Sequence, residues 1–280
     1  MRDSLFEKSS DRTRLVTAAI GIPLVLLVVW LGSWPFGLVV GVLALIALRE
    51  LEAACERAGT PLVAGIAYAV LILILLLAQF YVLAGLRTHW GAPLVFFLVW
   101  FVPVALLVAG VLAYDPPQRI SLITIALTQL AVSYVGLFAF LILLRGFAGG
   151  GQHLFWIVLT GVWVGDSASY FFGRKFGKTP LTPLSPNKTL EGTVAGVVAA
   201  LLVCVLVANS FGFGWGHALA LGALISLAAP LGDLVESFWK RELQIKDLGT
   251  ILPGHGGVLD RCDSLLFAAF AVYLYALWRI

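Results

Sequence analysis

Residues 237–264 read S-F-W-K-R-E-L-Q-I-K-D-L-G-T-I-L-P-G-H-G-G-V-L-D-R-C-D-S and are flanked on both sides by apolar segments long enough to span a bilayer. The stretch holds bases and acids together: Lys240, Arg241, Lys246, Arg261, Glu242, Asp247, Asp260 and Asp263. Ionisable groups at a bilayer are costly unless they are paired, hydrated or bound to a metal, so they indicate a functional site. Lysine and arginine suit phosphate, and aspartate suits a hard cation such as Mg2+. This stretch therefore predicts phosphate chemistry at a membrane.

The composition of the whole chain is that of a polytopic membrane protein. Of its 280 residues, 61% are hydrophobic and only 12% are charged, and the mean hydropathy is +1.01. A soluble protein carries about twice that charged fraction. The net charge of +3 does not indicate a nucleic-acid partner, because topology alone enriches membrane proteins in cytoplasmic bases.

We predict an all-α fold of about nine transmembrane helices, although eight or ten also fit the pattern. A span needs about 20 mainly apolar residues. The candidate spans are 15–31, 35–55, 62–85, 92–113, 119–144, 153–173, 190–210, 215–239 and 264–279.

Charge placement predicts that the N-terminus lies in the cytoplasm. That orientation leaves only Arg87, Arg145 and Arg279, of the 18 basic residues, on the opposite side of the membrane. It therefore satisfies the positive-inside rule.

The carboxylates are distributed unevenly along the chain. Asp115 is the only one between residues 58 and 165, whereas eight follow from Asp166 onward. We therefore expect residues 1–150 to form scaffold helices and residues 151–280 to form the catalytic region of one continuous membrane domain.

Two polar clusters precede the quoted stretch. On a helix, Asp166, Ser169, Tyr170 and Gly173 would share one face, either as part of a site or as a contact between helices. Residues 185–193 resemble a helix N-cap region, which could bind phosphate or simply cap the helix.

The third cluster adds a polar stripe to the quoted stretch. Asp233, Glu236, Ser237 and Lys240 have the spacing of one helix face. Asp260, one turn before Asp263, opens the last helix, and with Asp233 it could bracket a cation. The alternative is a set of structural ion pairs at a corner between helices.

The third cluster resembles the signature of phosphatidate cytidylyltransferases, also called CDP-diacylglycerol synthases. The matching positions are Ser237, Lys240, Arg241, Lys246, Asp247, Pro253, His255, Gly256, Gly257, Asp260, Arg261 and Asp263. The likeness also includes Gly165, Asp166, Tyr170, Gly173 and Arg174 upstream, and Ser185 through Gly192, so it covers roughly residues 160–265.

The resemblance implies that CTP and phosphatidate react to give CDP-diacylglycerol and pyrophosphate, with Mg2+ required. The catalytic residues it implies are Asp233, Asp260, Lys240, Arg241 and Asp166, with Asp233 and Asp260 holding the metal. Asp166 would support a second cation, for which K+ is a candidate, or orient the site. The substrate-binding residues it implies are Ser185, Lys188, Ser237, Lys246, His255, Arg261 and Asp263. His255 could instead be a general base, a metal ligand or a cap of its turn.

The expected location is a bacterial inner membrane, with membrane lipids around the protein and the site facing the cytoplasm, where CTP is found. A homodimer is expected from the family resemblance alone. Two other functions stay open at this point. One is a secondary transporter or cation channel, and the other is a CTP-dependent lipid kinase that would transfer the γ-phosphate instead.

Overall fold

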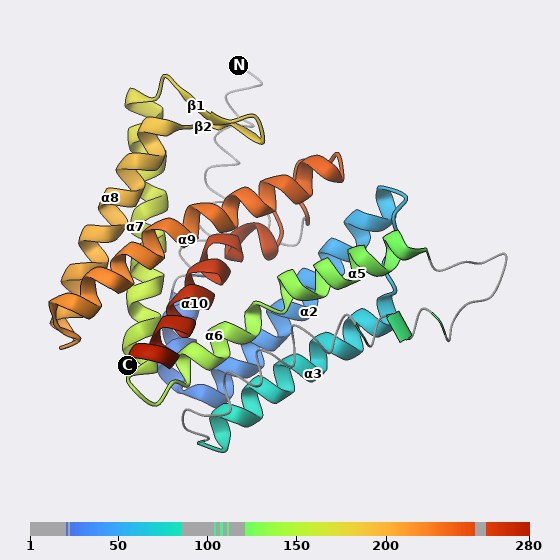
Figure 1. Cartoon of the computed structure of the whole chain (residues 1–280), viewed down its shortest axis with the longest axis horizontal. Coiled ribbons are helices and arrows are strands. Elements are labelled where there is room, and N and C mark those ends of the chain that lie inside the picture. Colours follow the sequence, from blue (N-terminus) through green and yellow to red (C-terminus); the bar gives the residue numbers. More distant parts are fainter. Residues whose placement is uncertain are drawn as a thin grey trace. The chain divides into compact units, whose positions relative to one another are not determined.

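The computed structural model describes residues 21, 23–85, 104, 107, 108, 111, 121–249 and 256–280, and these residues are mostly helical (Figure 1). The elements, labelled as in Figure 1, are α2 (Ser33–Arg57), α3 (Ala64–Leu83), α5 (Leu122–Val135), α6 (Phe138–Arg145), α7 (Gly151–Phe176), β1 (Pro180–Thr182), β2 (Ser185–Thr189), α8 (Leu190–Ser210), α9 (Gly214–Glu242) and α10 (Leu259–Arg279).

Six helical segments among the described residues are long and apolar enough to cross a membrane. They are Ala64–Leu83, Leu122–Arg145, Gly151–Phe176, Leu190–Ser210, Gly214–Glu242 and Leu259–Arg279. Each overlaps one of the predicted spans. Helix α2 coincides with the predicted span 35–55, although it is not among these six. Most of the predicted span 92–113 and the start of 15–31 lie outside the described residues, so the count of nine stays a prediction.

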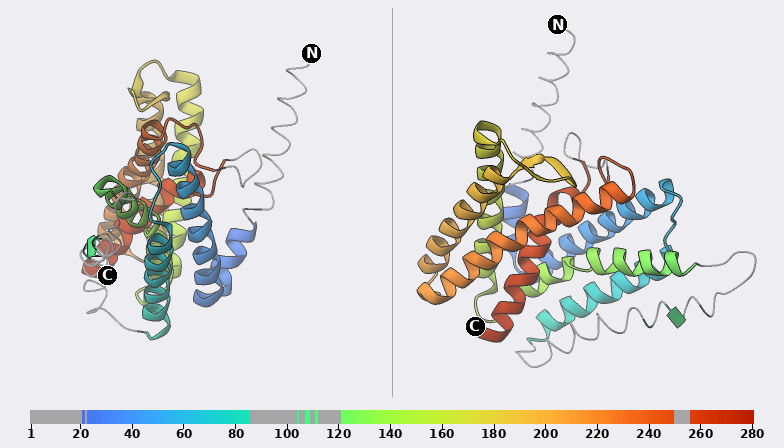
Figure 2. Two further views of the ribbon diagram at one scale, coloured as in Figure 1. Left: turned by 90° about the vertical axis from the view of Figure 1, so that its right-hand side faces the viewer. Right: turned by 45° about the horizontal axis from the view of Figure 1, so that its top comes forward.

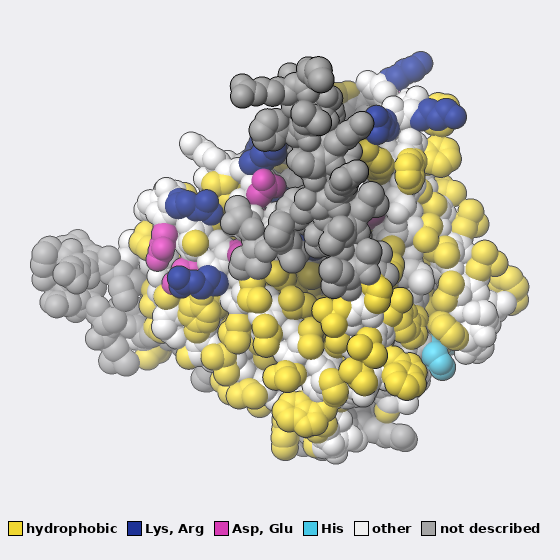
Figure 3. Space-filling model, turned by 180° about the vertical axis from the view of Figure 1, so that it is seen from behind, with side chains coloured by type: hydrophobic (Ala, Val, Ile, Leu, Met, Phe, Trp, Pro, Cys, Tyr) yellow, Lys and Arg dark blue, Asp and Glu magenta, His cyan; other side chains and the backbone are white. Residues whose placement is uncertain are grey.

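The surface of these helices is strongly apolar. Leu202 and Leu206 on α8 are 59% and 66% exposed, and hydrophobic side chains cover much of the face seen in Figure 3. An apolar surface of this extent is typical of helices that are surrounded by lipid. The sequence-based prediction of a multi-pass membrane protein is therefore supported.

The chain divides into two compact units. The first contains Met1–Ala139 and Leu243–Arg261, and the second contains Phe140–Glu242 and Cys262–Ile280. In the first unit α2, α3 and α5 pack together. Polar contacts join these helices: the Val63 amide donates to Thr128 Oγ1 at 2.9 Å, and the Tyr68 hydroxyl donates to Glu52 Oε2 at 2.8 Å.

In the second unit α7, α8 and α9 lie side by side (Figures 1 and 2). Glycines bring α7 and α8 together. A Cβ atom added at Gly196 would meet Ser169 Oγ and lie 2.7 Å from the Gly165 carbonyl oxygen, and one added at Gly192 would lie 2.8 Å from Gly173 Cα. Small residues allow such backbone approach between membrane helices. The helix contact considered for the Asp166 cluster is therefore present.

We expect Gly196→Ala to destabilise the protein by about 1–3 kcal/mol, because the added methyl group overpacks the contact between α7 and α8. The measurement is the thermal unfolding midpoint in detergent. The matched control is Gly216→Ala on α9, where a Cβ atom meets nothing within 4 Å. Equal midpoints for the two variants would contradict the close contact.

A short hairpin connects α7 to α8, which the all-α prediction did not include. Strands β1 and β2 are antiparallel, with Pro180 opposite Thr189 and Thr182 opposite Ser185. The expectation of a helix cap for residues 185–193 is correct only from Thr189 onward, since the Thr189 hydroxyl accepts the Gly192 N–H at 3.2 Å. Residues 185–188 pair as a strand instead.

Glu191 holds the hairpin against the first turn of α8. Its carboxylate accepts hydrogen bonds from the Lys178 N–H at 3.1 Å, and from the backbone N–H and the hydroxyl of Thr179 at 3.2 and 2.9 Å. A carboxylate in the first turn also interacts favourably with the helix dipole. The residues that lead into β1 are therefore anchored to the start of α8.

Candidate active site

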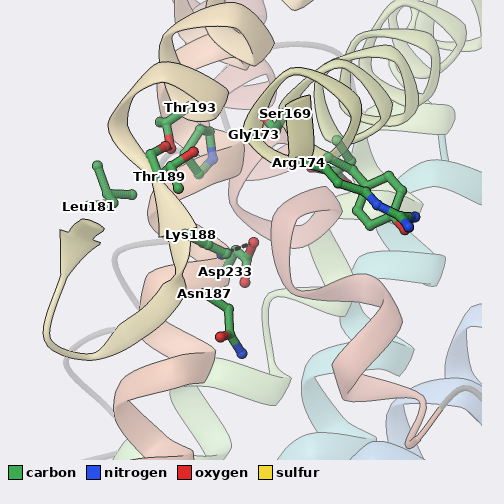
Figure 4. A pocket seen from close by; sticks show the side chains of 12 residues that line it. Ser169, Gly173, Arg174, Leu181, Asn187, Lys188, Thr189, Thr193 and Asp233 are labelled. Atoms are coloured by element: carbon green, nitrogen blue, oxygen red, sulfur yellow. Dashed lines mark hydrogen bonds and ion pairs between the residues drawn. The ribbon is translucent and has the colours of Figure 1, made fainter. Parts of the chain in front are cut away.

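A cavity of about 440 Å3 opens in the second unit, where α7, the hairpin, α8 and α9 meet (Figure 4). It is lined by Asp166, Ser169, Tyr170, Gly173, Arg174, Leu181, Asn187, Lys188, Thr189, Thr193, Pro230 and Asp233. Carboxylates, bases and hydroxyl groups thus face one space, which has the size of a small-ligand site.

One wall of the cavity comes from α7. Asp166, Ser169, Tyr170 and Gly173 all line it, so the predicted helix face is confirmed and points into the cavity. The Arg174 guanidinium donates to the Tyr170 hydroxyl at 3.2 Å, which holds a positive charge at the same wall. Gly173 leaves little space beside Thr189, because a Cβ atom there would lie 3.1 Å from Thr189 Oγ1.

The opposite side carries an ion pair between the hairpin and α9. Lys188 on β2 contacts the Asp233 carboxylate through its ammonium group (Figure 4). Both side chains are about one-third exposed, so they are open to the cavity and to solvent. The ion pair places a phosphate-binding residue type directly beside a metal-binding one.

Asp233 also belongs to a group of three acidic residues. Metal-ligand atoms of Asp233, Glu236 and Asp263 all lie within 4.8 Å of one another, and Glu236 and Asp263 are buried. The group forms because α9 and α10 approach closely at Gly232, where a Cβ atom would lie 3.0 Å from the carbonyl carbon of Asp263. Three converging carboxylates fit a hard divalent cation, because they supply the oxygen ligands that such an ion prefers.

The two bases at the end of α9 are held by neighbouring groups. The Lys240 ammonium contacts Glu236 Oε1 at 2.7 Å, one turn away on the same helix. The Arg241 Nε–H donates to the Leu184 carbonyl oxygen at 3.0 Å, which ties α9 to the turn of the hairpin. Ser185 on β2 and Ser237 on α9 are half-buried in the same unit. Arg241 thus also has a structural partner, which the sequence did not reveal.

The remaining predicted residues belong to the first unit. They are Lys246, Asp260 and Arg261, and His255 lies outside the described residues. The Asp260 carboxylate accepts the Leu248 N–H at 3.3 Å and the Gly257 N–H at 2.6 Å. Because Asp233 and Asp260 fall in different units, their sharing of one cation stays a prediction.

Sequence reasoning did not assign several residues that the structure places at the site. The sequence predicts Glu236 only as part of the polar stripe, although its spacing of three residues from Asp233 is a local signal for a second carboxylate beside that residue. Asn187, Thr189 and Thr193 enter the cavity because of the hairpin and the start of α8. The contacts that the hairpin makes with other helices, such as Lys188 with Asp233 on α9, join distant positions and have no comparable local signal.

A model of the cytidylyltransferase family matches residues 12–278. The chain belongs to the cytidylyltransferase family. The match covers nearly the whole sequence, including the apolar N-terminal half that the resemblance of residues 160–265 left open. Membership of the family is therefore supported by nearly the whole chain, residues 12–278.

Several curated relatives of this cytidylyltransferase family member carry the name phosphatidate cytidylyltransferase. The protein from Helicobacter pylori is 40% identical over 180 residues, which are 62% of this chain and 65% of that relative, so the match spans just under two thirds of its length. The proteins from Staphylococcus haemolyticus and Staphylococcus aureus are 35% and 34% identical over 259 and 264 residues, each covering 91% of this chain and 95% of the relative.

Proposed function

We propose that this membrane protein transfers the cytidylyl group of CTP to phosphatidate, producing CDP-diacylglycerol and pyrophosphate in phospholipid biosynthesis. The observation that carries the proposal is the cavity lined by Lys188, Arg174, Asp166 and Asp233, where Asp233 also belongs to the acidic group with Glu236 and Asp263. Relatives named for this reaction support it across most of the chain.

The reaction does not require a strong general base from the protein. An oxygen of the phosphatidate phosphate attacks the α-phosphorus of CTP, and the bond from that phosphorus to the bridging oxygen of the β-phosphate breaks. The attacking phosphomonoester is already largely dianionic near neutral pH, since its second pKa is about 6. Catalysis then rests on aligning two anions and neutralising their charge.

The cationic side chains supply part of that neutralisation. Lys188 and Arg174 line the cavity, and we propose that they bind phosphate oxygens together with Lys240 and Arg241 at the end of α9. Lys246 and Arg261, with Ser185, Ser237 and His255 as hydrogen-bond donors, complete the proposed substrate-binding set. Asn187, Thr189 and Thr193, from β2 and the start of α8, add polar groups to the lining of the cavity.

We further propose that Mg2+ is the cofactor, with Asp233 as its central ligand. Asp233, Glu236 and Asp263 form a donor set that fits this ion, and Asp260 is the partner implied by the family signature. When bound there, the ion would neutralise charge on the attacking and leaving oxygens. Asp166 is proposed to hold a second cation such as K+ or to orient the site.

The proposed topology has nine spans with the N-terminus in the cytoplasm of a bacterial cell and the site at the cytoplasmic side of the inner membrane. This orientation follows the distribution of basic residues. It allows the acyl chains of the lipid to stay in the bilayer while the headgroup enters a polar cavity between helices. A homodimer is proposed from the family resemblance.

The experiment that tests the function uses CTP labelled separately at the α- and γ-phosphates, with the purified protein and phosphatidate in detergent. We expect the α-label in lipid and the γ-label in pyrophosphate, and we expect EDTA to stop both. The γ-label in lipid would instead identify a lipid kinase. No transfer of either label, together with movement of ions into proteoliposomes, would identify a transporter or channel.

A further inference from the structure

Glu50 is a buried carboxylate that the proposed mechanism does not use. It lies on α2 and is 4% exposed. A carboxylate removed from water is costly unless hydrogen bonds or charges compensate it. Its burial near the charged end of α2 therefore calls for a role, and its contacts show where that role lies.

The Glu50 carboxylate contacts the backbone at the start of α10. Its Oε2 atom accepts the Val258 N–H at 2.8 Å and the Leu259 N–H at 3.4 Å. The first N–H groups of a helix have no partner within the helix, and its N-terminus attracts negative charge. Val258 has no side-chain acceptor, so Glu50 acts as the cap of α10 from a different helix.

Two glycines let the backbone close around this carboxylate. A Cβ atom at Gly249 would lie 2.6 Å from Glu50 Cγ, and one at Gly257 would lie 2.5 Å from Glu50 Oε2. The Asp260 carboxylate bonds the N–H groups of Leu248 and Gly257, which adjoin the same contacts. Glu50 thus bonds residues 258–259 and packs against Gly249, while Asp260 bonds the adjoining residues 248 and 257.

We propose that Glu50 is a positioning residue, which fixes the start of α10 and thereby places Asp260 and Arg261 for cytidylyl transfer. This inference rests on the proposed function. Glu50 acts through the backbone, because its described hydrogen bonds go to main-chain N–H groups and not to a substrate-binding side chain. The requirement is for an acceptor of glutamate length, since aspartate would be one methylene too short.

The test compares Glu50→Ala and Glu50→Gln in the full-length protein. We expect kcat to fall about a hundredfold in Glu50→Ala, because a misplacement of about 1 Å at a reacting group can cause a loss of that size. The KM for CTP should change less than about threefold, since the proposed phosphate contacts that line the cavity, Lys188 and Arg174, do not depend on Glu50. Glu50→Gln keeps one carbonyl acceptor and should recover part of kcat. Amide hydrogen exchange at residues 256–261 should be faster in Glu50→Ala.

The matched control is Glu52→Ala, which removes a similarly buried carboxylate from α2 that accepts its hydrogen bond from Tyr68. A Glu50→Ala protein that keeps kcat within about twofold of wild type would overturn the inference. A second result would also overturn it. In that result Glu52→Ala loses as much kcat as Glu50→Ala, and Glu50→Ala leaves amide exchange at residues 256–261 unchanged.

If the proposed cytidylyl transfer is wrong, the experiment shows it separately from the role of Glu50. In that case the wild-type protein itself transfers no α-label from CTP to lipid. Exchange at residues 256–261 then decides whether Glu50 fixes the start of α10: faster exchange in Glu50→Ala supports the positioning role, and unchanged exchange overturns it.

Discussion

Asp233→Asn should lower kcat for pyrophosphate release by about a thousandfold or more. Asp233 is both a cavity wall residue and a member of the group formed with Glu236 and Asp263. A metal at a reacting phosphate supplies several kcal/mol of transition-state stabilisation, and about 1.4 kcal/mol corresponds to a factor of ten in rate. The measurement is single-turnover transfer of α-labelled cytidylyl to lipid over a range of Mg2+ concentrations.

The control is Glu242→Gln, which neutralises an exposed carboxylate on the same helix that lines neither the cavity nor the acidic group. It should keep kcat within about twofold. If Asp233→Asn retains more than about a tenth of wild-type kcat at saturating Mg2+, Asp233 is not a ligand that the reaction needs.

The same experiment tests the predicted sharing of one ion by Asp233 and Asp260. If both side chains hold one cation, Asp260→Asn should cause a similar loss, and the double variant should be little worse than either single variant. Multiplicative losses would separate Asp260 from that ion and leave Glu236 and Asp263 as the partners of Asp233.

Lys188→Ala should raise the apparent KM for a phosphate-bearing substrate by about ten- to a hundredfold, since hydrogen bonds to charged groups contribute about 1.5–3 kcal/mol. It should also tighten Mn2+ binding in the absence of substrate. In the structure Lys188 is paired with Asp233, so its ammonium group competes with a cation for that carboxylate. The gain should be only about two- to fivefold, because partly exposed ion pairs contribute about 0–1 kcal/mol.

Mn2+ binding to the detergent-solubilised protein can be followed by electron paramagnetic resonance, independently of turnover. Lys175→Ala is the control, because Lys175 is also a base of the α7–hairpin region but stacks over the Phe176 ring and does not line the cavity. Weaker Mn2+ binding in Lys188→Ala would show that Lys188 does not compete for Asp233.

Helices and their polar faces could be predicted from the sequence because both depend on neighbouring residues. The predicted span 190–210 coincides with α8, and the predicted helix face of Asp166, Ser169, Tyr170 and Gly173 lines the cavity. The hairpin could not be predicted in this way, since Pro180–Thr182 and Ser185–Thr189 are short and include proline and asparagine, which are uncommon in strands.

The sequence by itself determined that this chain is a helical membrane protein whose carboxylates gather with bases in its second half, because hydrophobic length, helical spacing and charge are properties of consecutive residues. Only the tertiary structure decided that Asp263 joins Asp233 and Glu236, that Lys188 pairs with Asp233, and that Glu50 caps a helix beginning 209 positions later. The acidic group and the Glu50 cap depend on the close approach of separate backbones at Gly232, Gly249 and Gly257, and all three contacts join residues far apart in the sequence, which linear spacing does not encode.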